Sequence, residues 1–203
     1  MKHRIALLVT GASGMLLPRH LLGLLAARQD IDRVHLVVSA GASQVLRHEL
    51  GAAQTGAVDL LEAAELDAAQ RRRIVTHRDS DLDAPISSGS YHLAGTVVLP
   101  CSAGTLGALA TGSARTLVHR AGAVALKEHW PLVLGFRETP LSLMHIENMR
   151  RLAYAGAILL PPLPAFYIGG EDMQRFLDHY ALRVLDQLGI HEPGEPGLRW
   201  GEE

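Results

Sequence analysis

The chain has 203 residues, 48% of them hydrophobic, and a formal net charge of −2 at pH 7. This length suits one domain with a sizeable buried core better than two domains. Because the charge is near zero and the basic residues are not massed in one block, we expect no nucleic-acid partner held by bulk charge. Cys101 is the one cysteine, so no internal disulfide can form, which is typical of a reducing compartment.

The start of the chain carries a short apolar run at residues 5–9. This run is too short to span a membrane, and it lacks the small-residue cleavage site of a secretory signal. We therefore expect a cytoplasmic protein with no membrane association.

Six short apolar runs are predicted as strands, and several are apolar on both faces, as in a parallel sheet covered by helices on both sides. They are residues 4–10, 34–39, 74–77, 96–101, 132–135 and 157–160. Six longer segments are predicted as helices: residues 17–28, 43–50, 60–72, 114–128, 141–154 and 172–188. The alternation predicts one α/β domain over residues 1–190, with a doubly wound, Rossmann-like (flavodoxin-like) parallel sheet. The turn-rich residues 191–203 are predicted as an irregular C-terminal extension.

Ligands of doubly wound folds bind beyond the carboxyl ends of the strands, so the segments after the strands are the candidate site. The first of them reads Thr10-Gly11-Ala12-Ser13-Gly14. Glycine has no Cβ and lets backbone N–H groups approach an anion, and the following helix adds its positive end. The sequence therefore predicts a turn that holds a phosphate; the alternative is a tight turn without a ligand.

A nicotinamide dinucleotide is the first candidate for such a turn, but three features argue against it. The third glycine of the dinucleotide fingerprint would fall at Leu17, which Pro18 follows. The second strand ends in Ser39 rather than in the acidic residue that binds ribose hydroxyls. No tyrosine is followed four residues later by a lysine, so the usual catalytic pair of that class is missing.

A second group of small polar residues follows the fourth strand. Ser102, Gly104 and Thr105 precede a predicted helix and can hold the polar edge of a ring or a second phosphate. The alternative is ordinary N-capping by the two hydroxyl residues, and both roles can hold together.

Four cations stand at candidate site positions. Arg120 and Lys127 lie two turns apart on one predicted helix and share a face. Arg137 follows the fifth strand, and Arg183 stands beside the apolar stripe of the last helix. A solvated surface charge is the alternative for each of them taken alone.

Two carboxylates are candidates for moving a proton. Glu138 stands next to Arg137, where it is either half of a surface pair or a base beside a phosphate-bound cation. Glu49, near the end of the second helix, is a weaker candidate. The eleven histidines show no metal-ligand spacing, and Cys101 is predicted to pack in the sheet as a small apolar residue.

Together these segments resemble a flavin prenyltransferase of the UbiX type, over nearly the whole chain. The matching stretches are Thr10-Gly11-Ala12-Ser13-Gly14, Ser87-Ser88-Gly89-Ser90, Pro100-Cys101-Ser102, Gly104-Thr105-Leu106, Val124-Ala125-Leu126-Lys127-Glu128, Pro131-Leu132-Val133-Leu134, Arg137-Glu138-Thr139-Pro140, His145, Glu147-Asn148-Met149, Pro164-Ala165-Phe166-Tyr167 and Arg199-Trp200. The Lys-Glu, Arg-Glu-x-Pro and Phe-Tyr segments in this order are far more specific than the first turn.

The resemblance implies a site for FMN made by Gly11, Ala12, Ser13, Ser39, Ser102, Ala103, Gly104, Thr105 and Arg137. It implies a site for dimethylallyl phosphate made by Ser90, Arg120, Lys127, Tyr167 and Arg183, with help from Arg137. The implied catalytic residues are Ser13, Glu49, Lys127 and Glu138. The implied reaction joins the prenyl group to N5 and C6 of reduced FMN without a metal. Prenylated FMN would then pass to a UbiD-type decarboxylase, and the family's dodecamer implies a homo-oligomer.

The chain also departs from the usual pattern of this family. Met15-Leu16-Leu17-Pro18 replaces Ala-x-Tyr-Gly, and Ala40 replaces the lysine that usually follows the strand-two serine. Ser113-Ala114-Arg115-Thr116 replaces an asparagine-rich stretch, and Ala123 replaces an aspartate. These changes surround the implied site and remove none of its phosphate ligands.

Two alternatives to the transferase stay open at this point. One is an FMN-dependent decarboxylase of the cysteine decarboxylase group, with which older descriptions of the family as aromatic acid decarboxylases belong. Those enzymes typically carry an asparagine where this chain has Gly104, whereas Lys127, Arg137 and Arg183 favour an anionic second substrate. The other is a non-catalytic flavin carrier, which only a turnover assay separates from the transferase.

Overall fold

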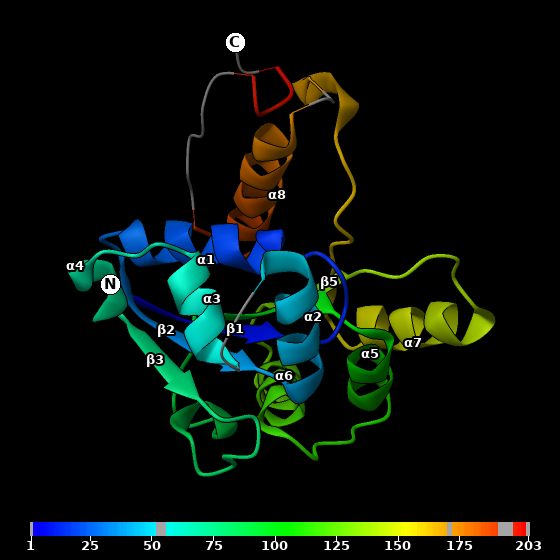
Figure 1. Cartoon of the computed structure of the whole chain (residues 1–203). Coiled ribbons are helices and arrows are strands. Elements are labelled where there is room, and N and C mark those ends of the chain that lie inside the picture. Colours follow the sequence, from blue (N-terminus) through cyan, green and yellow to red (C-terminus); the bar gives the residue numbers. More distant parts are fainter. Residues whose placement is uncertain (1, 52–55, 170–171, 191–196, 202–203) are drawn as a thin grey trace.

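The computed structural model describes residues 2–51, 56–169, 172–190 and 197–201. One parallel sheet of six strands has the order β3-β2-β1-β4-β5-β6 (Figure 1). The strands are β1 (His3–Val9), β2 (Ile31–Val38), β3 (Ile74–His77), β4 (Gly95–Cys101), β5 (Leu132–Phe136) and β6 (Ile158–Leu159). All six predicted strands and the predicted fold class are confirmed.

The helices cover both faces of this sheet. They are α1 (Leu16–Ala27), α2 (Ala40–Leu50), α3 (Ala57–Ala63), α4 (Ala68–Arg71), α5 (Ala103–Ala110), α6 (Leu117–Lys127), α7 (Leu143–Tyr154) and α8 (Met173–Gln187), with short 3-10 turns η1 (Pro85–Ser87) and η2 (Phe166–Ile168). Buried side chains of α1, α2, α3 and α8 share one hydrophobic cluster, and those of α5, α6 and α7 share the other. The sheet is therefore wound on both sides, as the alternating pattern predicts.

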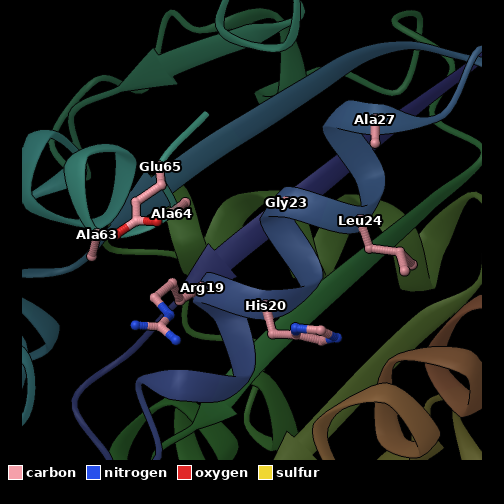
Figure 2. A pocket seen from close by; sticks show the side chains of 8 residues that line it. All are labelled: Arg19, His20, Gly23, Leu24, Ala27, Ala63, Ala64 and Glu65. Atoms are coloured by element: carbon pink, nitrogen blue, oxygen red, sulfur yellow. The ribbon is translucent and has the colours of Figure 1, made fainter. Parts of the chain in front are cut away.

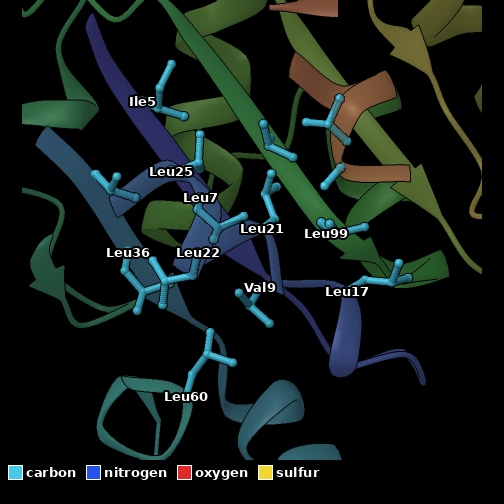
Figure 3. Close-up of a cluster of buried hydrophobic side chains, with 14 of the residues drawn as sticks. Ile5, Leu7, Val9, Leu17, Leu21, Leu22, Leu25, Leu36, Leu60 and Leu99 are labelled. Carbon is cyan, nitrogen blue, oxygen red and sulfur yellow. The ribbon is translucent and has the colours of Figure 1, made fainter. Parts of the chain in front are cut away.

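The larger cluster shows why these residues form these elements (Figure 3). Leu7 and Val9 of β1 and Leu36 of β2 meet Leu21 and Leu22 of α1, and all five side chains are fully or almost fully buried. Burying a leucine side chain contributes roughly 1.5–3 kcal/mol. Every second side chain of β1 faces α1, and the apolar side chains of α1 recur at helical spacing on the side that faces the sheet. The two sets thus pack as a single apolar layer between sheet and helix.

β4 is buried along its whole length. Its last residue, Cys101, is fully buried, and this burial raises the pKa of the thiol to about 12. The prediction that Cys101 packs as a small apolar residue is confirmed.

The predicted helix over residues 60–72 is wrong, because the chain forms two short helices there. Glu65, between them, has a φ of 52°, which no α-helix accommodates. Asp67 then starts α4 with a capping box, in which its carboxylate accepts from Gln70 N at 2.8 Å and the Gln70 side chain accepts from Asp67 N. A helix end and a new helix start are therefore encoded inside one apolar-periodic stretch.

The region after β4 also differs from the prediction. Ser102 caps α5, and Gly104 and Thr105 lie in its first turn rather than before a helix. The predicted helix over residues 114–128 begins later, at Leu117, because the Thr116 side chain caps it by accepting from His119 N. The hydroxyl cluster is thus itself a helix start.

The end of the chain packs on α8. His179 Nδ1 donates to Leu198 O at 2.8 Å, and Leu198 is buried. Arg199 forms an ion pair with Asp186 at 2.8 Å. Residues 191–196 lie outside the described residues, so the boundary between domain and extension stays a prediction. In the described part of the chain, no helix is long and apolar enough to cross a membrane.

Candidate functional site

The sheet order reverses between β1 and β4, which is where doubly wound folds bind their ligands. Thr10 joins the ends of these two strands. Its hydroxyl donates to Pro100 O at 2.7 Å and accepts from Ser102 N at 2.8 Å. Because Thr10 is almost fully buried, this bridge fixes the first turn against the start of α5.

The turn after β2 lies against the first turn. A Cβ on Gly11 would stand 2.9 Å from the carbonyl carbon of Gly41, so only glycine permits this approach. Ser39 caps α2 by accepting from Ala42 N at 3.2 Å. The starts of α1, α2 and α5 therefore converge at one place, as the sequence predicts for Ser39 and the first turn.

The start of α1 already holds an anion, and that anion is the Glu49 carboxylate. It accepts from Met15 N at 2.7 Å and from Gly14 N at 3.0 Å. These N–H groups lie at the end of the predicted phosphate turn and in the residue after it. A carboxylate from the last turn of α2 occupies the amides of Gly14 and Met15, so the predicted anion site of the turn is left with the groups of Gly11, Ala12 and Ser13 and stays a prediction.

Glu49, Ser13 and Arg137 form one electrostatic cluster. Burial alone would raise the pKa of the Glu49 carboxyl, but hydrogen bonds from Met15 N, the Ser13 side chain and Gly14 N, with the charge of Arg137, lower it below its ordinary value. Glu49 is therefore an anion held beside a hydroxyl and a guanidinium.

Arg137 is anchored by its backbone N–H, which donates to Cys101 O at 3.2 Å. Its Nε is buried and has no hydrogen-bond partner among the described residues. A buried, unpaired guanidinium nitrogen is costly, and an anionic or carbonyl group of a ligand would satisfy it.

The first turn of α5 completes this cradle, by which we mean Ser13, Ser39, Glu49, the first turn of α5 and Arg137. Ser102 Oγ accepts from Thr105 N at 3.3 Å and donates to Thr105 Oγ1 at 3.1 Å. Ala103 and Gly104 follow the cap, and no heavy atom lies within 4 Å of the position that a Cβ on Gly104 would take. Glu138 stands exposed beside Arg137, with its carboxylate accepting from Thr139 N at 3.1 Å.

Three of the predicted substrate residues lie together elsewhere, on α6 and the segment after η1. Arg120 Nε donates to Ser87 O at 2.9 Å. Ser90 Oγ lies 2.8 Å from Ser88 Oγ. Lys127 forms an ion pair with Glu128, and both side chains lie where a Cβ on Gly89 would stand. The predicted shared face of Arg120 and Lys127 therefore lies along this serine-rich segment.

This α6 cluster does not meet the cradle within one chain. α6 starts near the carboxyl edge of the sheet, where Leu117 N donates to Asp79 O just beyond β3. It ends at Lys127, shortly before β5 begins at the opposite edge. Ten residues of α-helix span about 15 Å, so Lys127 is far from the carboxyl edge.

Tyr167 and Arg183 lie in a third place, at the end of the chain. They line a cavity of about 280 Å³ together with His179, Leu182, Leu198, Arg199 and Trp200. The Tyr167 ring meets the Trp200 ring edge-on at 5.2 Å, and Arg183 contacts Asp186 at 3.2 Å. In Figure 1 this part of the chain and α6 lie on opposite sides of the sheet.

Two further cavities are found beside these three places. One, of about 410 Å³, lies between α1 and α3 and contains no predicted site residue (Figure 2). The other, of about 840 Å³, lies in front of α2 and is lined by two arginines, Arg78 and Arg115, which sequence reasoning did not assign to the site. Among the described residues, no group of three or more His, Cys, Asp or Glu side chains is placed to hold a metal ion.

The convergence of three loop-to-helix turns and a guanidinium with an unpaired Nε at the β1–β4 switch point is typical of a doubly wound protein of the nucleotide-binding class. The model of the Flavoprotein family matches residues 1–175. The chain belongs to this family, and specifically to its UbiX-type flavin prenyltransferases, which confirms the resemblance carried by the motifs.

The similarity extends over nearly the whole chain. The flavin prenyltransferase UbiX of Pseudomonas aeruginosa is 39% identical over 202 residues, covering 98% of this chain and 95% of that protein. A dodecameric FMN-dependent UbiX-like decarboxylase from Escherichia coli O157:H7 superposes with a TM-score of 0.82 at 37% identity, covering 97% of this chain and 98% of its own. AnUbiX (PadA1), in complex with FMN and dimethylallyl pyrophosphate, gives a TM-score of 0.80 at 34% identity, with 94% of each chain covered.

Proposed function

We propose that this protein is a flavin prenyltransferase, which joins a dimethylallyl group from dimethylallyl phosphate to N5 and C6 of reduced FMN. The observation that carries the proposal is the cluster of Ser13, Glu49 and Arg137 in the cradle. It puts an anion, a hydroxyl and an unpaired cation at the switch point where this fold binds nucleotides. A close relative bears the name flavin prenyltransferase, and AnUbiX holds FMN with a prenyl donor.

FMN fits the donors of the cradle. The buried Nε of Arg137 lacks a partner, and a flavin ring offers carbonyl and ring-nitrogen acceptors. The first turn of α5, with Ser102, Ala103, Gly104 and Thr105, is bound to the turn after β1 through Thr10, and nothing lies within 4 Å of where a Cβ on Gly104 would stand, so a ligand can approach there. Reduced FMN supplies the nucleophilic nitrogen and carbon of the reaction.

The proton steps fall to residues that already touch one another. The hydrogen bond between Ser13 and Glu49 links a hydroxyl to a carboxylate that stays charged well below neutral pH. Such a pair can take a proton from the flavin edge and pass it on, since the lowered pKa of the carboxyl favours its return to the charged form. Glu138, next to Arg137, is the second candidate for this role; its carboxylate accepts from Thr139 N, whereas that of Glu49 accepts from two backbone amides.

Breaking the allylic carbon–oxygen bond leaves negative charge on phosphate, which must be stabilised where it develops. Lys127 and Arg120 on α6, with Ser90, supply cations and a hydroxyl for that task, and Tyr167 and Arg183 supply another set. These groups make a divalent metal unnecessary for holding the leaving phosphate.

The three separate places can act as one site only where copies of the chain meet. The similar E. coli O157:H7 protein is a dodecamer. Large apolar side chains are exposed near the third place, including Leu163, Phe166 and Trp200. We therefore propose a homo-oligomer, with the dodecamer as its form, in which other copies bring the α6 cluster and the Tyr167–Arg183 cavity to each cradle.

A second candidate function rests on one observation, namely that the similar E. coli O157:H7 protein is described as a decarboxylase. An FMN-dependent decarboxylase would use the cradle without needing the α6 cations. The concentration of phosphate-binding cations at three places favours the transferase over both this function and a flavin carrier.

The direct test is to incubate the purified protein with reduced FMN and dimethylallyl phosphate and to measure the mass of the flavin. A gain of one prenyl unit supports the transferase, and unchanged FMN at full occupancy overturns it. A parallel reaction with the diphosphate identifies the donor. Delivery of the product to a UbiD-type decarboxylase is tested by measuring whether the product restores the activity of that decarboxylase. The cytoplasmic location that the lone Cys101 favours is tested by cell fractionation.

A further inference from the structure

The cavity of about 840 Å³ beside the start of α2 contains none of the site residues described so far in its lining. One wall is the start of α2, with Ala40 and Ser43, and the facing walls carry Arg78, just after β3, and Arg115, just before α6. Segments far apart in the sequence thus place two guanidinium groups around one opening at the carboxyl edge of the sheet.

The electrostatics of this cavity favour an anion. Neither Arg78 nor Arg115 forms an ion pair or donates a side-chain hydrogen bond within the described part of the chain. One carboxylate, that of Asp79, also lines the cavity, but it is engaged, since its Oδ1 accepts from Val118 N at 2.9 Å at the start of α6. The first turn of α2, Ala40 to Ser43, contains no charged side chain, so the positive charge comes from outside that helix.

The cavity is continuous with the cradle. Ala40, in its wall, directly follows Ser39, which caps α2. The neighbouring Gly41 is in backbone contact with Gly11 of the first turn. Glu49 takes the amides of Gly14 and Met15 at the start of α1, so these two groups do not hold the phosphate of a ligand in the cradle. The cavity beyond Ser39 adjoins the cradle and is lined by two arginines, Arg78 and Arg115, that form no ion pair within the described part of the chain.

We propose that this cavity receives the phosphate of FMN and that Arg115, assisted by Arg78, supplies its counter-charge. This inference rests on the proposed function and assigns a residue that determines specificity for FMN over riboflavin. The Arg115 guanidinium, just before α6, would then neutralise the phosphate from across the cavity. A cation at position 40 would neutralise the same phosphate from the first turn of α2.

The test compares FMN with riboflavin, which lacks only the phosphate. The Kd of each flavin is measured by quenching of flavin fluorescence for the wild-type protein and for Arg115→Ala. We expect the Kd for FMN to rise about tenfold or more, since a charge-assisted bond to phosphate is lost, while the Kd for riboflavin is unchanged. Arg47→Ala is the matched control, because it removes an equal charge from the far end of α2 and should leave both Kd values unchanged.

A second variant tests the position of the charge. Ala40→Lys in the Arg115→Ala background returns a cation to the same cavity and should recover most of the FMN affinity. An unchanged FMN Kd in Arg115→Ala, or an equal loss for FMN and riboflavin, overturns this inference while leaving the transferase proposal standing. Failure of the wild-type protein to bind FMN would overturn both.

Discussion

Glu49 closes the start of α1 by accepting a hydrogen bond from the backbone N–H of Met15 at 2.7 Å. In many proteins a glycine turn before a helix leaves the helix start free to bind the phosphate of a ligand. In this protein a side chain occupies that position. Here the helix dipole and two backbone amides stabilise the charged form of a side chain instead. The turn Thr10 to Gly14 thereby holds a charged carboxylate in place.

Replacing Glu49 by glutamine should slow prenyl transfer by about 10²–10⁴-fold, because a general base is lost while shape and size are kept. The amide can still accept from Met15 N, so the Kd for FMN should stay within about threefold of wild type. Single-turnover formation of prenylated FMN measures the rate. Glu65→Gln, a carboxylate in the α1–α3 cavity, should turn over normally, and wild-type turnover by Glu49→Gln would remove Glu49 from the mechanism.

The same substitution should change the response of the fold to acid. The pKa of Glu49 is lowered in the folded protein, so its contribution to stability is present above the ordinary carboxyl value of 4.5 and is lost as pH falls through the lowered pKa. We expect wild type to unfold at lower urea concentration as pH drops through this window, and Glu49→Gln to show a flatter dependence. Parallel curves for the two proteins would contradict the assignment.

Thr10→Val tests the bridge between β1 and β4. Valine has the shape of threonine but leaves Pro100 O and Ser102 N without the buried hydroxyl that satisfies both. We expect a loss of about 1–3 kcal/mol in the free energy of unfolding, measured in urea, and weaker FMN binding. Thr111→Val, at an exposed hydroxyl on the end of α5, should cost far less. Equal losses would mean that the buried bridge has no special role.

The strands were predictable because they are short apolar runs, four of which (β1, β2, β4 and β5) are largely buried in the sheet. The break between α3 and α4 depends instead on the backbone of Glu65, which no periodicity reveals. Ser39 and Ser102 were recognisable as candidate site residues because strand ends share one edge of a parallel sheet. The separation of Lys127 from Arg183 could not be predicted, since spacing along a chain carries no information on which side of the sheet a helix packs. The cavity lined by Arg115 could not be predicted for the same reason.

A buried chain of side chains beneath the α2 cavity makes stability depend on pH in a second way. His35 Nδ1 lies 2.9 Å from His77 Nε2, and His35 Nε2 lies 3.0 Å from Tyr91 Oη. Burial, with the charges of His77, Arg4 and Arg33, lowers the pKa of His35 from 6.5 to about 4. His35 therefore stays neutral in the folded protein while it takes up a proton on unfolding below pH 6.5.

Stability from this histidine is complete above pH 6.5 and is lost as pH falls toward 4. Between pH 7 and pH 5 the loss is about 2 kcal/mol. Urea unfolding across this range should show the loss in wild type and a much smaller one in His35→Leu, whatever the absolute stability of the variant. His48→Gln, on the exposed surface of α2, should keep the wild-type slope, and an unchanged slope in His35→Leu would assign the effect elsewhere.

The separation of Lys127 from Arg183 leads to a prediction about mixed assemblies. Lys127→Ala and Arg183→Ala should each lose prenyl transfer by at least about 10²-fold, because each removes a cation from the leaving phosphate. If different copies supply the two residues, assemblies formed from an unfolded or dissociated mixture of both variants contain some sites with both cations. Such mixtures should regain part of the wild-type activity. Mixtures of Lys127→Ala with Arg120→Ala should not, because both residues lie on α6 of one copy and reach the site together. Recovery in both mixtures, or in neither, would contradict a site shared in this way.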